Sequence, residues 1–149
     1  MDVKLADLEI GAPKIFSLNA TGAGPGAIQD GSAPACQTAS GCPMADGTHY
    51  TASAGDILVI YASGLGQTTP AAIDGLSGSG TVTLPSVAFT ANNVTKVATP
   101  VYAGATSCCS ALYQVNVAVP AGLGANNAAQ VTVTVGNGNT SNTVTIAVK

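Results

Sequence analysis

The feature that most constrains the fold is a regular alternation of apolar and polar residues in short segments. In the segment Leu112–Pro120 (LYQVNVAVP), one face carries Tyr113 and three valines, and the other carries Gln114 and Asn116. Successive side chains of a strand point to opposite faces, so this pattern predicts a half-buried strand that ends at Pro120. The stretch 130–148 (QVTVTVGNGNTSNTVTIAV) alternates in the same way twice, which predicts a hairpin with its turn at Gly136–Asn139.

Two further segments predict strands. The stretch 86–104 (SVAFTANNVTKVATPVYAG) predicts a hairpin that turns at Asn92-Asn93, with Pro100 marking an edge or bulge in its second arm. The apolar run 56–64 (DILVIYASG) is too short for a helix and predicts a buried central strand. Short strands separated by turn residues predict an all-β antiparallel sandwich. We expect one domain over residues 11–149, preceded by an extension or edge strand at 1–10.

The charge content limits the partners of the chain. Charged residues make up only 7% of the 149 residues, whereas about 25% is typical of soluble domains. The four cationic side chains are scattered lysines, so we expect no nucleic-acid partner. No apolar run approaches the roughly 20 residues that span a bilayer, so we expect no membrane span. The start MDVKLADLEIG lacks the features of a signal peptide, and we expect an excised or mature piece of an exported protein.

Four ordered motifs carry a resemblance to a known family. They are GAPKIFSLNATGAGPGAIQDGS (11–32), AGDILVIYASGLGQTTPAAIDG (54–75), PVYAG (100–104) and LYQVNVAVP (112–120). In order and spacing the chain resembles the uncharacterised C-terminal domain family of Solibacter-type acidobacterial secreted proteins. The resemblance implies an immunoglobulin-like sandwich in an extracellular or cell-surface protein, beside other domains of that protein. It implies no catalytic residue and no cofactor.

All four cysteines fall where the chain departs from that family pattern, in a longer loop at 33–53 and in ATSCCSA. Cys36 and Cys42 bracket a short polar loop and can form a local disulfide. Adjacent cysteines such as Cys108 and Cys109 have Cα atoms about 3.8 Å apart, below the roughly 4.4 Å of ordinary disulfides. Two local bridges, cross-loop bridges and free thiols remain alternatives. The spacing matches no zinc pattern, so we expect no metal and an oxidising compartment.

The residues that could carry chemistry are dispersed. His49 is the single histidine, which we expect to be exposed in a loop rather than to activate a nucleophile. Three Asp-Gly pairs, at Asp30, Asp46 and Asp74, are typical of turns. We expect Lys14 to be an ordinary surface lysine, with an isopeptide bond as the alternative. We therefore expect no enzyme.

Two functions fit these observations. The first is a non-catalytic structural or adhesion module that binds other domains of its own protein or identical subunits, in which residues 2–10 donate a strand to a neighbour. The second is a carbohydrate-binding module. Sugar sites usually expose aromatic rings, but Tyr61, Phe89 and Tyr113 lie in strand patterns and are expected to face the core. A glycan would then bind a loop site that includes Tyr50, Cys108 and Cys109.

Overall fold

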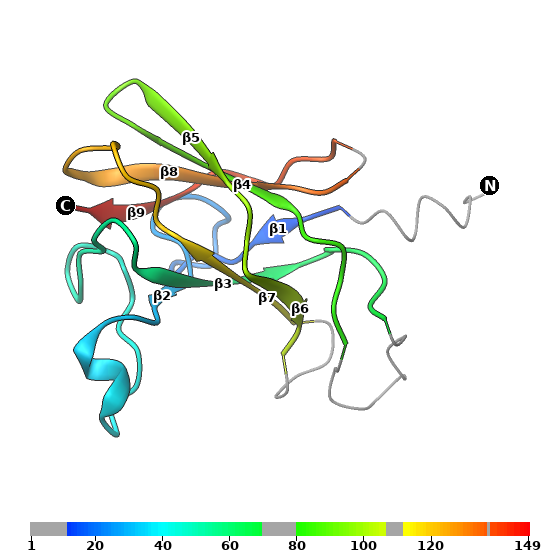
Figure 1. Ribbon diagram of the computed structural model, residues 1–149, viewed down its shortest axis with the longest axis horizontal. Coiled ribbons are helices and arrows are strands. Elements are labelled where there is room, and N and C mark those ends of the chain that lie inside the picture. Colours follow the sequence, from blue (N-terminus) through cyan, green and yellow to red (C-terminus); the bar gives the residue numbers. More distant parts are fainter. Residues whose placement is uncertain (1–11, 70–79, 107–111, 137) are drawn as a thin grey trace.

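Two antiparallel sheets lie face to face (Figure 1). The computed structural model describes residues 12–69, 80–106, 112–136 and 138–149. The first sheet contains β1 (Lys14–Ile15), β2 (Ile28–Asp30), β3 (Ile57–Ser63), β6 (Tyr102–Ala105) and β7 (Tyr113–Ala118). The second sheet contains β4 (Ser86–Ala91), β5 (Val94–Ala98), β8 (Asn126–Thr134) and β9 (Val144–Val148). A short 3-10 helix, η1 (Pro34–Gln37), lies in the long connection between β2 and β3.

The strand order is that of an immunoglobulin-like sandwich. In the first sheet β3 pairs with both β1 and β2 on one side and with β7 on the other, and β6 follows β7. In the second sheet the order is β5-β4-β8-β9. Immunoglobulin domains arrange strands A, B, E and D in one sheet and strands G, F and C, with an added C′, in the other. In this correspondence β3 is B, β4 is C, β5 is C′ and β9 is G. The expected all-β sandwich is confirmed.

Both predicted hairpins are present. β4 and β5 are joined at Asn92 and Asn93, whose φ angles of 52° and 63° suit a two-residue hairpin turn. β8 and β9 pair antiparallel, and an added bridge from Thr134 to Thr140 places the predicted glycine-rich turn at the tip. The second arm of the first hairpin ends at Ala98, and the chain passes through Pro100 into the other sheet as β6. Pro100 therefore marks the crossing between the sheets, and the expectation that it lies at an edge or bulge within the second arm of the hairpin is wrong.

β3 is central in its sheet, as predicted, but it alternates rather than being buried on both faces. Leu58, Ile60 and Ala62 are fully buried, whereas the residues between them are half-buried. Tyr61 therefore points away from the core, and its hydroxyl donates to Gln29 Oε1 at 2.9 Å. The expectation that Tyr61 faces the core is wrong. A continuous apolar run does not reveal that one of its faces will be covered by a polar loop.

The inner faces of the two sheets form a single apolar core. Phe89 of β4 is its largest fully buried side chain. It is surrounded by aliphatic residues from both sheets, among them Leu58, Ile60, Val115, Val117, Val131, Val133 and Ile146. Tyr113 packs at the margin of this core, as its strand pattern predicts, and its hydroxyl donates to the Gly66 carbonyl at 2.7 Å. The valine alternation therefore builds the contact between the sheets.

One asparagine joins the first strand to the start of the last. Asn142 Oδ1 accepts a hydrogen bond from the Ile15 N–H at 2.8 Å. Its Nδ2 donates to the carbonyls of Ile15 and Gly22, at 2.9 and 2.7 Å. The side chain thus satisfies backbone groups on the outer edge of β1 as a neighbouring strand would.

Several sequence predictions lie outside the described residues: the extension 1–10, Asp74, and the pair Cys108 and Cys109. Within the described part of the chain, no helix has the length and apolar character needed to cross a membrane.

Truncation of Phe89 tests the core. Phe89→Ala should lower the free energy of unfolding by about 3–5 kcal/mol, because it removes a ring from a site with 0% exposure. Thr90→Ala, one residue further on the outer face of β4, should cost less than about 1 kcal/mol. Urea unfolding of the oxidised protein measures both. Equal losses at the two positions would contradict the assignment of the faces.

Candidate functional site

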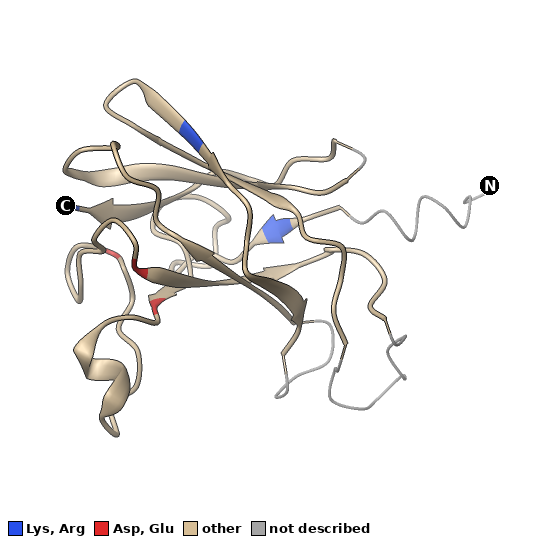
Figure 2. Cartoon of the chain, viewed as in Figure 1, with Lys and Arg blue, Asp and Glu red and all other residues tan. Residues whose placement is uncertain are grey.

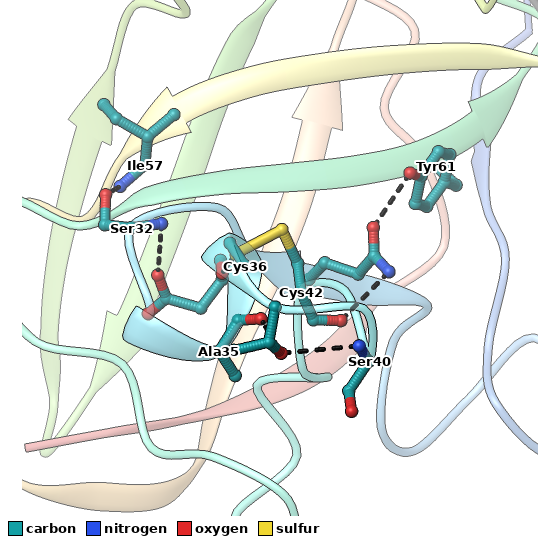
Figure 3. Close-up of a disulfide and its surroundings, with 10 residues drawn as sticks. Ser32, Ala35, Cys36, Ser40, Cys42, Ile57 and Tyr61 are labelled. Carbon is teal, nitrogen blue, oxygen red and sulfur yellow. Dashed lines mark hydrogen bonds between the residues drawn. A yellow bond between two sulfur atoms is a disulfide. The ribbon is translucent and has the colours of Figure 1, made fainter.

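The connection between β2 and β3 carries the disulfide. Pro34 begins η1, where a missing N–H is tolerated, and Cys36 in η1 is bonded to Cys42. Inside the closed loop, Thr38 Oγ1 donates to the Ala35 carbonyl at 2.7 Å and accepts the Ser40 N–H at 3.3 Å (Figure 3). The local Cys36–Cys42 bridge is confirmed. The pairing of Cys108 and Cys109 stays a prediction.

The disulfide loop is fastened to the outer face of the first sheet. Gln29 Nε2 donates to the Cys42 carbonyl at 3.1 Å, and Gln29 Oε1 accepts the Tyr61 hydroxyl (Figure 3). At the other end of the loop, Ser32 Oγ accepts the Ile57 N–H at 2.8 Å. The loop is therefore held at both ends by side chains of β2 and β3 and the turn between them.

Beneath this loop, the fold brings together two carboxyl groups that are far apart in sequence. Asp30 ends β2 with 0% exposure, and Asp56 directly precedes β3, the strand with which β2 pairs. Asp30 Oδ1 accepts the Ser32 N–H at 2.9 Å, and its carboxyl group forms a side-chain hydrogen bond with Asp56. Asp30 Oδ2 is buried and has no N–H or neutral hydroxyl partner among the described residues, so a proton on the Asp30 carboxyl would relieve this position beside Asp56. The acidic residues of the described chain gather at this end of the sandwich (Figure 2).

Burial raises the pKa of Asp30 to about 7, and the hydrogen bond and negative charge of Asp56 add to the rise. The N–H groups of Ser32 and Ala33 oppose it. Asp30 is closed to solvent, so this pair is a structural element of the loop base and no substrate can reach its inner carboxyl. The Asp30-Gly31 dipeptide predicts a turn, and the bond from the Ser32 N–H confirms it, but no local pattern predicts the burial of Asp30 beside Asp56.

Asp46 and His49 form a second, exposed pair. Asp46 Oδ1 accepts the N–H groups of Thr48 and His49, at 2.9 and 2.7 Å, in the turn that its Asp-Gly dipeptide predicts. His49 is 67% exposed, as expected, and its Nδ1 lies 2.7 Å from Asp46 Oδ2. Burial raises the pKa of Asp46. The hydrogen bonds from these N–H groups and the His49 ring lower it by a larger amount, so the pKa of Asp46 lies below its ordinary value.

Tyr50 is less available than expected for the loop site. It is half-buried, and Lys149 Nζ lies 5.6 Å from the centre of its ring, within the range of a cation–π contact. Its proposed companions Cys108 and Cys109 lie outside the described residues. The structure therefore places Tyr50 beside the C-terminal residue and does not describe its relation to the cysteine pair.

A cleft beside β1 exposes an aromatic residue that the sequence analysis did not single out. Phe16 is 45% exposed and lines a cleft of about 550 Å³ together with Ser17, Thr21, Ser63 and Asn142. The walls are well ordered by hydrogen bonds, since Asn19 Oδ1 accepts both the Ser17 and Thr21 hydroxyls, at 2.9 and 2.8 Å. The exposure of Phe16 could not be predicted from the sequence, because the strand before it, β1, has only two residues and shows no alternation of apolar and polar positions.

Lys14 lines the same cleft and is exposed. The amide of Asn142, an asparagine lining the same cleft, already donates to two carbonyls, and none of the described residues lining the cleft is acidic. Lys14 thus has the surroundings of an ordinary surface lysine. Among the residues that the structure describes, no group of three or more His, Cys, Asp or Glu side chains is placed to hold a metal ion.

Comparison of the chain with family models, with curated proteins and with solved structures found no match.

The buried carboxyl pair predicts an unusual pH dependence. The folded-state pKa of Asp30 is about 7, above its unfolded value near 3.8, so folding favours the protonated form. This contribution to stability is complete below about pH 4 and is lost as the pH rises through 7, with a slope of at most about 1.4 kcal/mol per pH unit. Asp30→Asn, which keeps a donor towards Asp56, should abolish this fall and be more stable than wild type at pH 8.

Asp46→Asn is the matched control. The lowered pKa of the wild-type Asp46 carboxylate means that it stabilises the folded state at pH values above its unfolded pKa. Loss of this carboxylate in Asp46→Asn should therefore destabilise the protein at pH 8. Chemical unfolding at pH 4, 6 and 8 measures both variants. A loss of stability at pH 8 in Asp30→Asn as well would contradict the protonated, buried state of Asp30.

Proposed function

We propose that this chain is a non-catalytic structural or adhesion module of a secreted or cell-surface bacterial protein, as its family resemblance implies. The observation that carries the proposal is the Cys36–Cys42 disulfide, which closes a polar loop at the end of a charge-poor sandwich. Disulfides of this kind persist in oxidising compartments. A sandwich with rigid loops is a common support for binding surfaces outside cells.

The described titratable pairs support a non-catalytic role. Asp30 and Asp56 hold the base of the disulfide loop, and Asp46 and His49 hold a turn. The bonds of each pair are those of local structure, with backbone N–H groups as the main partners. We propose that the partners of the module are other domains of the same protein or identical subunits, which assemble into a fibre by strand addition. A surface with few charges offers little electrostatic repulsion to such packing.

Location and redox state test the proposal together. Antibodies to the module should label intact cells or the culture medium, and thiol blocking before lysis should leave Cys36 and Cys42 unmodified. Cys36→Ser with Cys42→Ser should lower stability by about 2 kcal/mol or more if the bridge closes the loop in the native protein. Recovery of the protein in the cytosol with both thiols reactive would contradict the extracellular assignment.

Carbohydrate binding is the second candidate function, and the Phe16 cleft favours it. An exposed ring can stack on the apolar face of a sugar, while Ser63 and neighbouring hydroxyl groups offer hydrogen bonds. In this candidate the stacking ring is Phe16, rather than the Tyr50 of the loop site expected from the sequence. It is neutral apart from Lys14, which suits an uncharged saccharide.

A glycan screen with a pair of variants tests this candidate. Phe16→Ala should abolish any binding to neutral glycans, because it removes the stacking surface, whereas Tyr50→Ala should leave it unchanged. Isothermal titration with the best glycan measures the effect, expected to be about tenfold or more in affinity. A screen without binding, or binding that survives Phe16→Ala, would remove the cleft as a sugar site.

A further inference from the structure

Nearly every sheet edge among the described residues is closed. On the outer edge of β9, Thr145 exchanges hydrogen bonds with Gly24 and Gly26, and the Ala147 N–H donates to Ala45 at 2.9 Å. The Ala52 N–H and the Lys149 N–H complete this edge, with the carbonyls of Ala147 and Ala52 as acceptors. Both bridges of this edge, Pro25 to Thr145 and Ala52 to Val148, are parallel. No outward backbone group of these β9 residues is left for a partner.

The edges of the first sheet are closed by other means. The chain at 43–45 covers β2, since Pro43 accepts the Asp30 N–H and the Ala45 N–H donates to Ile28. The Asn142 side chain covers β1. The chain at 80–82 covers β6, and Gly104 allows this close approach, because a Cβ at that position would lie 2.5 Å from the Gly80 carbonyl oxygen.

β5 is the exception. In a two-residue hairpin, bonded and non-bonded pairs alternate from the turn, so the N–H and C=O groups of Thr95 and Val97 point away from β4. No backbone hydrogen bond from the described residues reaches this outer edge. Val97 of β5 is 67% exposed, more than any other large apolar side chain in the described strands. An open edge with an exposed apolar side chain is a template for an added strand.

Lys96 selects what can pair there. It lies opposite Phe89 in the register, on the inward side of the edge strand, and is exposed because no further strand covers it. A charge in this place opposes edge-to-edge pairing. Full antiparallel overlap of two β5 strands would also place Lys96 opposite Lys96 of the second copy, and like charges directly opposite are destabilising. A suitable added strand is therefore acidic and partly apolar.

We propose that the β5 edge accepts residues 2–10 (DVKLADLEI) of a second copy of this chain. The segment carries Asp2, Asp7 and Glu9 against one lysine, together with four large aliphatic residues, and its nine residues exceed the five of β5. The inference rests on the proposed self-assembly and names its acceptor edge. Because donor and acceptor are different surfaces, the contact is head-to-tail, and such contacts build a fibre where the rotation between copies does not close into a ring.

Val97→Pro tests the acceptor. It removes an N–H that points outwards and leaves the pairing with β4 in place, which is the position where edge strands tolerate proline. Val97→Ala, which keeps the N–H, is the control, and circular dichroism melting confirms that both variants fold. By light scattering against concentration, the wild type should grow in mass, whereas Val97→Pro and a variant lacking residues 2–10 should each stay monomeric. Mixed together, these two defective variants should form a 1:1 dimer and stop.

A peptide separates this inference from the broader proposal. The synthetic peptide 2–10 should bind the variant lacking residues 2–10, and Val97→Pro in that variant should weaken binding by about tenfold or more in fluorescence anisotropy. Lys96→Glu should also weaken it, and a peptide with Asp7→Lys and Glu9→Lys should restore binding to Lys96→Glu.

Each remaining outcome overturns the inference in a distinct way. Association that persists in Val97→Pro keeps self-assembly and rejects the β5 edge. Association that persists without residues 2–10 but not in Val97→Pro indicates β5 pairing with β5 of a second copy. A wild type that is monomeric at every concentration contradicts the proposed fibre itself. If the peptide still binds the shortened variant in that case, the segment occupies the edge of its own chain.

Discussion

The contact between two apolar sheet faces is the interaction on which the rest of the structure depends. The inner face of each sheet is apolar, because in strands such as β7 and β8 valine alternates with threonine and other polar residues. Phe89 and its aliphatic neighbours bury those sides against each other. Removal of one such side chain costs a large fraction of the 5–15 kcal/mol that is typical of a whole domain. The loops at both ends of the sandwich are held in place by this packing.

Once the faces are packed, the backbone groups at the sheet edges must still find partners. This chain satisfies them with irregular segments and, at β1, with the side chain of Asn142. Such closure suits a charge-poor protein, which has few charged residues with which to protect exposed edges. The β5 edge differs from the other described edges because no described chain segment or side chain covers its backbone groups, and its one charge is the inward Lys96. The proposed partner strand adds at this open edge.

The loop end of the sandwich shows how a scaffold with few charges places its polar groups. The Cys36–Cys42 bridge closes a polar loop, and Gln29 and Ser32 fasten that loop to the sheet. Asp30 is buried beneath it beside Asp56, and burial raises the pKa of Asp30 to about 7, which favours its neutral form where a buried acid would usually pair with lysine or arginine. The stability of the loop is thereby linked to pH as well as to the redox state of the cysteines.

The longer strands and the hairpin turn were predictable from the sequence, because alternation and turn chemistry are local properties, whereas the short strands β1 and β2 carry no pattern long enough to predict them. The strands at 113–118 and 144–148 and the Asn92-Asn93 turn follow directly from the printed residues. The local pairing of Cys36 with Cys42 was among the alternatives, since only five residues lie between them. Only the tertiary structure decided that Asp30 meets Asp56, that Phe16 is exposed, that Tyr61 faces outwards, and that β5 is open. These properties depend on which segments become neighbours across sheets and edges, and no spacing along the chain encodes that.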